Sequence, residues 1–352
     1  MFLSGIGTAV PPQRYTQSDC LSVYENTGRL PPLTADSDSL VRQILGGQNG
    51  IIARHLALES LDEAFALDPD SLHARFLKNA PTLASRAAER GLEAAQLDAK
   101  EIDSVIISTC TGYLCPGLSS YVIENLGLRS DIQAFDLVGQ GCGAALPNLR
   151  MAESLLHSGS SDHVLSISVE VCSAAFYFDN DPGVLISACL FGDGAAATVW
   201  SRNQPSEGRR VEWIEAESLI DPSHRDTLRF EQRNGMLRNI LTRQVPIEAA
   251  FSAEEVLTKV LKRNALAQTD IACWILHAGG REVLRALGKR IGLAETDLRH
   301  SAAILRDHGN LSSPFVLFTL DRALADSSPG GWWWMSSFGA GFSCHGALLK
   351  VD

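Results

Sequence analysis

The sequence predicts an α/β fold in which buried strands alternate with helices and two halves of the chain repeat one pattern. In the first half a Val-Ile-Ile strand at residues 102–108 precedes a helix at 118–126, and in the second a strand at 272–277 precedes a helix at 281–291. A strand before each helix is typical of α/β domains. Both helices end in Gly-Leu, and each is followed by a linker and a glycine-bearing turn that opens another helix. This weak repeat favours a duplicated βα unit.

The composition indicates a globular chain. The 352 residues are 45% hydrophobic and 20% charged, which suits one large or two moderate domains. A net charge of -11 argues against nucleic-acid binding, although a few local Lys or Arg side chains can still hold an anionic substrate. No apolar run has the length of a membrane span, and residues 1–12 look like a strand ending at Pro11 rather than a signal peptide. We therefore expect a cytoplasmic protein without a membrane span.

The first half is predicted to place helices around buried strands. Residues 16–81 are expected to be mostly helical, with Arg54 and His55 at a solvated strand end. A glycine turn at 190–194 enters a strand and is not a P-loop, because no Gly-Lys-Ser/Thr follows it. The other predicted strands lie at residues 102–108 and 164–171, and the predicted helices at 36–45, 60–65, 82–97 and 118–126.

The second half is predicted to begin after a polar segment at residues 201–210, which contains Pro205 and Gly208. We therefore divide the chain into residues 1–203 and 204–352. The predicted strands of the second half lie at residues 211–218, 272–277, 332–336 and 341–350, and its helices at 254–267, at 281–291 and in a segment that ends near 324.

Cys142 gives the strongest functional signal among eight scattered cysteines. The cysteines form no C-x-x-C pair, so we expect neither a metal site nor a disulfide framework. The thiols are therefore expected to be reduced. A short apolar run leads into Gly139, Gly141 and Gly143, and then into a helix. A Cys at that turn lies near the positive end of the helix dipole, which favours a thiolate nucleophile. The apolar face of the helix carries Ala145, Leu149, Ala152 and Leu156.

His277 and Asn310 are candidate partners of Cys142. His277 ends a predicted strand, and Asn310 lies in a Gly-Asn turn. Each of the three residues alone can have a purely structural role: Cys142 as a small buried residue at a crowded turn, His277 as a hydrogen-bonded residue at a strand end, and Asn310 as a turn residue. Together the three side chains would supply a thiolate that attacks a thioester and two hydrogen-bond donors for the carbonyl oxygen as it gains charge.

With these residues, the sequence resembles the type III polyketide synthases, the chalcone synthase-like branch of the thiolase superfamily. The resemblance covers nearly the whole chain and is firmest from about residue 102. The motifs that carry it are Gly141-Cys142, Leu190-Phe-Gly-Asp-Gly194, His277-Ala-Gly-Gly280, Gly309-Asn-Leu-Ser-Ser313 and Phe338-Gly-Ala-Gly341.

The resemblance implies a thiolase-like five-layered αβαβα fold built from two duplicated halves, one with the nucleophilic Cys142 and one with His277 and Asn310. It also implies a homodimer. The implied reaction is iterative decarboxylative condensation of malonyl-CoA onto an acyl-CoA starter held on Cys142, followed by closure to a pyrone, resorcinol or phloroglucinol ring. Coenzyme A thioesters are then the substrates, and neither a cofactor nor a carrier protein is expected.

The same resemblance implies a set of substrate-binding residues. Phe191 corresponds to a gatekeeper of the family, and Asn239 lies near the position of a second one, which is often Phe. Cys115 lies in the loop from which the family inserts a residue into the partner subunit's cavity. The full expected set is Thr111, Cys115, Phe178, Phe191, Asn239, Gly280 and Ser312. A departure occurs at Ala340, where the family often has Pro, so that loop is expected to be less rigid.

Two implied interactions concern the chemistry. A cationic His277 would pair with Cys142 and lower its pKa. Phe191 would present an apolar face to the malonyl carboxylate and favour its loss as CO2.

Three alternatives remain open on the sequence. A ketoacyl-[acyl-carrier-protein] synthase III has the same three side chains but usually carries His-Gln-Ala-Asn where this chain has His277-Ala-Gly-Gly280. A thiolase would use a second Cys near the C-terminus, and the surroundings of Cys344 do not match that loop. A catalytically silent scaffold with the same fold would have no need for all three polar groups.

Overall fold

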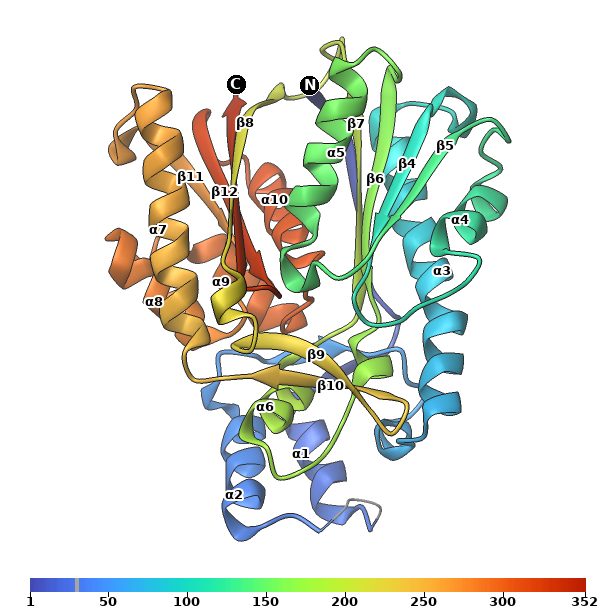
Figure 1. Cartoon of the computed structure of the whole chain (residues 1–352), viewed down its shortest axis with the longest axis vertical. Coiled ribbons are helices and arrows are strands. Elements are labelled where there is room, and N and C mark those ends of the chain that lie inside the picture. Colours follow the sequence, from blue (N-terminus) through green and yellow to red (C-terminus); the bar gives the residue numbers. More distant parts are fainter. Residues whose placement is uncertain (29–31) are drawn as a thin grey trace.

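A nine-stranded sheet forms the centre of the computed structural model, which describes residues 1–28 and 32–352 (Figure 1). The strand order is β11-β12-β13-β8-β1-β7-β6-β4-β5. The bounds are β1 Phe2–Ala9, β4 Ser104–Ser108, β5 Gln133–Leu137, β6 His163–Glu170, β7 Gly194–Ser201, β8 Val211–Ile220, β11 Ile271–Leu276, β12 Gly331–Gly339 and β13 Ser343–Val351.

The two halves of this sheet repeat one pairing scheme. In the first, β4 is parallel to β6, β6 antiparallel to β7, and β7 antiparallel to β1. In the second, β11 is parallel to β12, β12 antiparallel to β13, and β13 antiparallel to β8. The halves join where Phe2 of β1 pairs with Glu212 of β8. The α/β class is confirmed, and the shared scheme agrees with the predicted duplication. The boundary at residue 203 stays a prediction; it lies in the loop between β7 and β8.

Helices complete a five-layered arrangement (Figure 1). The helices α3 (Pro69–Ala95) and α4 (Leu118–Leu126) cover the first half, while α7 (Val245–Arg263) and α8 (Arg281–Ile291) cover the second. Between the halves lie α5 (Ala145–His157) and α10 (Phe315–Ala325), which both contact strands of the two halves. The apolar face predicted for α5 is fully buried, as the middle layer requires. In the outer layer, glycines let α3 approach β1, since a Cβ at Gly5 would lie 2.2 Å from the Gly91 carbonyl oxygen.

A smaller lobe covers one end of the sheet (Figure 1). It contains the helices α1 (Gln17–Asn26), α2 (Ala35–Gln43) and α6 (Pro182–Leu190), and the hairpin of β9 (Leu228–Arg233) with β10 (Met236–Leu241). The short strands β2 (Arg14–Thr16) and β3 (Ala53–His55) pair nearby, and α9 (Arg299–His308) contacts β3. Among the described residues, no helix has both the length and the apolar character needed to cross a bilayer.

Three sequence-based expectations about helix bounds and burial are wrong. The helix expected at 82–97 begins at Pro69, because Asp68 caps it and its buried face carries it through Pro81. The helix expected from 254 begins at Val245, with Pro246 in its first turn. Arg54 is not solvated: its side chain is buried and donates to the carbonyl oxygens of Ala188 and Phe191, both at 2.8 Å.

Candidate active site

Cys142, His277 and Asn310 line one cavity of about 1140 Å³, which we call the main cavity. Cys142 lies in a 3-10 turn at Gly141–Gly143, between β5 and α5. His277 directly follows β11, and Asn310 lies in the turn between α9 and α10. The nucleophile candidate thus comes from the first half of the fold and the two donor candidates from the second. The structure brings the three predicted residues together.

The second half also holds the Cys142 turn in place. Gly141 has a φ of 58°, and a Cβ there would lie 2.9 Å from the Ala340 backbone nitrogen. The Ser337 hydroxyl donates to the Gly143 carbonyl oxygen at 3.1 Å. Only glycine fits such a left-handed position against another backbone. The glycines around Cys142 therefore serve the close packing of this turn on the end of β12.

His277 is fully buried, whereas Cys142 is partly exposed to the main cavity. The Ser312 hydroxyl donates to Cys142 Sγ at 3.1 Å, yet burial raises the pKa of the Cys142 thiol to about 12. Burial also lowers the pKa of His277 to about 3. The rings of Phe315 and Phe338 pack edge-on against His277, with centroids 5.2 and 4.9 Å away, and neither imidazole nitrogen has a hydrogen-bond partner among the described residues.

These shifts favour a thiol at Cys142 and a neutral imidazole at His277. The pairing of a cationic His277 with Cys142 stays a prediction.

Asn310 is held from both ends of its amide. Its Nδ2 donates to the Gly279 carbonyl oxygen at 3.0 Å, and its Oδ1 accepts from the Ser312 backbone N–H at 2.8 Å. One N–H of the amide remains for a substrate. The backbone of Asn310 makes two further hydrogen bonds, both at 2.9 Å: its backbone N–H donates to the Leu190 carbonyl oxygen, and its backbone carbonyl oxygen accepts from the Gly192 N–H. Phe191, which lines the main cavity, is thereby fixed beside Asn310.

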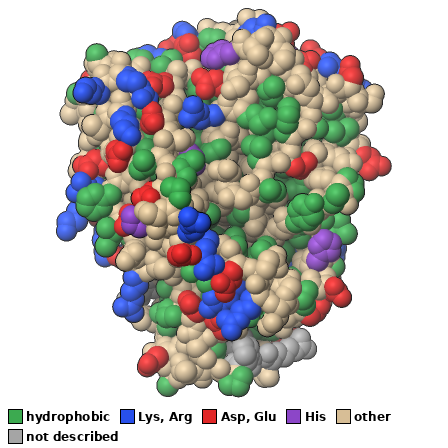
Figure 2. Space-filling view, viewed as in Figure 1, with side chains coloured by type: hydrophobic (Ala, Val, Ile, Leu, Met, Phe, Trp, Pro, Cys, Tyr) green, Lys and Arg blue, Asp and Glu red, His purple; other side chains and the backbone are tan. Residues whose placement is uncertain are grey.

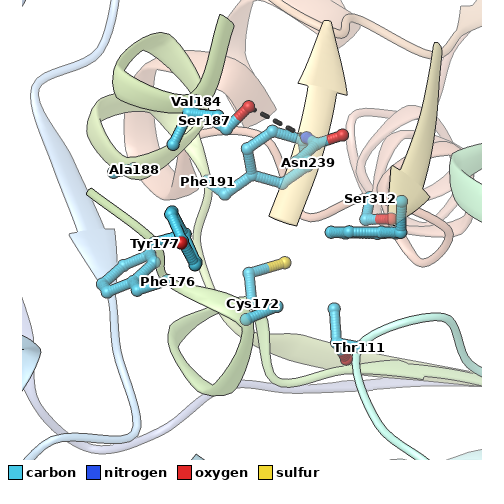
Figure 3. A pocket seen from close by; sticks show the side chains of 12 residues that line it. Thr111, Cys172, Phe176, Tyr177, Val184, Ser187, Ala188, Phe191, Asn239 and Ser312 are labelled. Atoms are coloured by element: carbon cyan, nitrogen blue, oxygen red, sulfur yellow. Dashed lines mark hydrogen bonds between the residues drawn. The ribbon is translucent and has the colours of Figure 1, made fainter. Parts of the chain in front are cut away.

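A second, much smaller space lies behind Phe191 (Figure 3), and we call it the inner cavity. Its volume is about 20 Å³, which is room for roughly one water molecule. Asn239 of β10 points into it and donates to the Ser187 hydroxyl of α6 at 2.9 Å. The predicted residues Thr111, Phe191, Asn239 and Ser312 all line it, together with Cys172, Ala175, Phe176, Tyr177, Val184, Ser187, Ala188 and Phe230.

The other three predicted substrate-binding residues lie elsewhere. Gly280 lines the main cavity where α8 begins. Phe178 lines neither of these cavities; it borders a side cavity of about 40 Å³, where its ring lies 5.7 Å from that of Phe65. Cys115 is exposed and borders none of the three cavities.

Glu170 is a contact of the site that the sequence did not predict. This fully buried carboxylate ends β6 and accepts from the Thr111 hydroxyl at 2.9 Å and the Ser313 hydroxyl at 2.6 Å. Its Oε1 lies 3.5 Å from the Ser312 hydroxyl oxygen. Burial raises the pKa of Glu170. The available signal was an acidic residue at the end of a strand that the sequence predicts to be buried, where an ionisable group is rarely placed without a reason.

Comparison with known proteins agrees with this geometry. Residues 61–214 match the family described as FAE1/Type III polyketide synthase-like protein, and residues 218–351 match the C-terminal domain of chalcone and stilbene synthases. A 3,5-dihydroxyphenylacetyl-CoA synthase from Amycolatopsis balhimycina is 30% identical, over 99% of this chain and 92% of that protein. A 1,3,6,8-tetrahydroxynaphthalene synthase from Streptomyces peucetius subsp. caesius is 29% identical over the same shares of the two chains.

The fold comparison gives the same family. The crystal structure of PKS-I from the brown alga Ectocarpus siliculosus superposes with a TM-score of 0.90 at 25% identity, over 99% of this chain and 98% of that one. The likeness extends over both duplicated halves and so over the whole site. The chain therefore belongs to the type III polyketide synthase family, the chalcone and stilbene synthase-like condensing enzymes with a thiolase-like fold.

Proposed function

We propose that this type III polyketide synthase holds its acyl chain on Cys142 and uses His277 and Asn310 to bind the oxygen that becomes negative. The observation that supports this proposal is that the three side chains line one cavity, where Asn310 has an N–H to spare and neither nitrogen of His277 has a partner among the described residues. The family acts on acyl thioesters by decarboxylative condensation of malonyl units, so each group has a task in it.

Starter loading begins with a proton transfer in this proposal. The Cys142 thiol gives its proton to a nitrogen of His277, and the resulting thiolate attacks the thioester carbonyl of the starter. The coenzyme A thiolate leaves and takes the proton from His277. Burial favours the neutral form of each group, and in the low-dielectric cavity the attraction between thiolate and imidazolium offsets part of that cost.

Chain extension uses the same two donors. Malonyl-CoA loses CO2, and the enolate oxygen accepts hydrogen bonds from His277 and from the remaining N–H of Asn310. Phe191, held beside Asn310, offers the carboxylate an apolar surface that favours neutral CO2 over the charged group. The enolate carbon then attacks the acyl carbonyl on Cys142, and the thiolate leaves.

The inner cavity points to a short acyl starter. Its volume of about 20 Å³ leaves little room behind Phe191 for an alkyl or aryl tail. Phe176 borders both the inner cavity and the side cavity, so its ring separates the two spaces. We propose that the starter tail on Cys142 extends past Phe191 towards the inner cavity, which would favour starters of the acetyl or malonyl class.

A comparison of starters tests this assignment. Acyl-CoA thioesters of increasing length are incubated with labelled malonyl-CoA, and products are identified by mass spectrometry. We expect polyketides from malonyl-CoA alone or with short starters, and a steep loss with longer ones. Phe176→Ala should join the two cavities and extend the accepted length, whereas Phe65→Ala, which enlarges only the side cavity, should not. Efficient use of long starters by the wild type would contradict the assignment, and absence of any polyketide would contradict the function itself.

We also propose that the chain is a homodimer and that the loop after β4 meets the partner subunit. Tyr113 is 71% exposed in that loop, two residues before the exposed Cys115, and Val138 is 58% exposed directly after β5, which pairs with β4. Since β5 is an edge strand of the nine-stranded sheet, this apolar edge would otherwise remain open. The role of Cys115 beside a partner's cavity, the cytoplasmic location and the independence from a carrier protein stay predictions.

Oligomeric state is the measurement that checks the dimer. Sedimentation velocity should give a dimer for the wild type and a shift towards monomer for the pair Tyr113→Glu and Val138→Glu. Ile247→Glu alters an equally exposed apolar residue on α7 and should leave the dimer intact. A monomeric wild type, or a double variant that dimerises as before, would refute the proposed interface.

A further inference from the structure

Histidines occur both at the surface and in the interior of this chain. Figure 2 shows histidine side chains on one face of the molecule, whereas His277, His300 and His345 are each at most 2% exposed. His277 belongs to the proposed site, and His300 lies near the start of α9. His345 lies in β13, and the proposed mechanism gives it no task. Burial of a polar ring is costly unless its contacts compensate, so the surroundings of His345 are informative.

His345 is the middle member of a polar row across three strands. It pairs in register with Ser337 of β12 and with Ser218 of β8, so the three side chains point to one face of the sheet. The Ser218 hydroxyl oxygen lies 2.8 Å from His345 Nδ1 and also accepts from Arg150 of α5 at 3.4 Å. The Ser337 hydroxyl donates to the Gly143 carbonyl oxygen at 3.1 Å. This face is therefore the one that meets α5 and the turn before it.

The imidazole of His345 packs directly against the Cys142 turn. A Cβ at Gly143 would lie 3.1 Å from His345 Cδ2 and 3.2 Å from the Gly339 backbone nitrogen. Gly143 is thus held between the ring and the end of β12. The ring atom Cδ2 is bonded to Nε2, which is buried and has no hydrogen-bond partner among the described residues. The ring therefore meets the turn by packing, and its orientation comes from Ser218.

The ring adds no charge beside the nucleophile. Burial lowers the pKa of His345 to about 4, and the Arg150 guanidinium shifts this pKa in the same direction. Both effects favour the neutral imidazole. His345 does not line the main cavity, so its influence on Cys142 passes through the backbone of Gly143 and depends on the shape and orientation of the ring.

We propose that His345 is a positioning residue for Cys142: its ring, oriented by Ser218, supports the turn and keeps the thiol directed at the thioester carbonyl. The inference rests on the proposed function, because it needs acyl transfer to Cys142. His277 and Asn310 come from other elements, the end of β11 and the turn between α9 and α10. His345 should therefore serve acyl transfer to sulfur and not the release of CO2.

Two rates measured on His345→Ala test this division. The variant should form acyl-Cys142 about tenfold more slowly than the wild type at saturating acetyl-CoA, because transfer depends steeply on the position of the attacking atom. Rapid quenching and intact-protein mass spectrometry give this rate. Adding His345→Ala to Cys142→Ala should leave CO2 release from malonyl-CoA unchanged. A general loss of structure would lower both rates.

Two further variants separate the parts played by the ring. His345→Asn carries its two terminal atoms where the imidazole has Nδ1 and Cδ2, so it keeps both contacts and should restore most of the loading rate. Ser218→Ala removes only the hydrogen bond that orients the ring, and it should slow loading in the same direction as His345→Ala but by less. Loading at the alanine rate by His345→Asn, or wild-type loading by Ser218→Ala, would contradict the proposed support of the turn.

The matched control is His300→Ala, which removes an equally buried imidazole whose Nε2 lies 2.9 Å from the Ser328 hydroxyl oxygen. It should leave acyl-Cys142 formation unchanged. Equal slowing by His300→Ala and His345→Ala, wild-type loading by His345→Ala, or a matching fall in CO2 release would overturn the proposal. Failure of the proposed function differs from all of these, because the wild type itself would then form no acyl-Cys142.

Discussion

Cys142→Ala should abolish polyketide formation while CO2 release from malonyl-CoA continues. Carbon–carbon bond formation needs an acyl group fixed on sulfur, and no other side chain of the main cavity is a nucleophile of that kind among the described residues. Decarboxylation needs only the donors of His277 and Asn310 and the apolar face of Phe191, which this variant retains. Radiolabelled malonyl-CoA reports the CO2, and intact-protein mass spectrometry reports the acyl adduct.

Cys110→Ala provides the matched control for this result. Cys110 Sγ lies 3.6 Å from the Ser312 hydroxyl oxygen, and that hydroxyl donates to Cys142, so the two thiols share one neighbour. Burial raises the pKa of Cys110, which makes it a poor nucleophile. The control variant should still carry an acyl group. Polyketide from Cys142→Ala, or an acyl adduct that disappears only in Cys110→Ala, would show that the nucleophile is assigned wrongly.

Asn310→Ala should slow decarboxylation about a hundredfold, because loss of one oxyanion donor costs roughly 3 kcal/mol. Starter loading should fall less, since Cys142 and His277 remain. One N–H of Asn310 already donates to Gly279, so the other is the one available to the enolate oxygen. Rates of CO2 release and of acyl-enzyme formation, measured separately on the same protein, give the two effects.

A second variant separates the donor from the structural role of Asn310. Asn310→Asp keeps an oxygen that can accept from the Ser312 N–H, but it has no N–H to give the enolate. It should therefore decarboxylate as poorly as the alanine variant, and it should unfold at a lower temperature than the wild type because the carboxylate cannot donate to the Gly279 carbonyl oxygen. If either variant released CO2 at the normal rate, Asn310 would not be the oxyanion donor.

The sequence was informative where short motifs coincide with element ends. Cys142 and Asn310 occupy glycine turns that open helices, and His277 ends a strand, so their approximate positions followed from local patterns. The pKa shift of His277 did not follow from local patterns, because it depends on burial by groups from other elements, such as the aromatic ring of Phe315. The size of the inner cavity likewise depends on packing between β10 and α6, which no local pattern encodes.

The hairpin of β9 and β10, which was not predicted, had a readable signal. Asn234 and Gly235 both have positive φ values, 53° and 77°, and Asn-Gly is the preferred pair for a two-residue hairpin turn. The flanking strands are only half buried and carry charges such as Arg229 and Arg233, which obscured their alternation.

The backbone bridge between Phe191 and Asn310 limits how product size can diverge in relatives of this enzyme. Two hydrogen bonds connect the Leu190–Gly192 turn to Asn310, so a side chain at position 191 that shifts this turn also shifts a proposed oxyanion donor. Phe176 and Asn239 shape the inner cavity without such a bond to Asn310. Evolution or engineering should therefore reach new chain lengths first through positions 176 and 239, with position 191 changing only alongside compensating substitutions near Asn310.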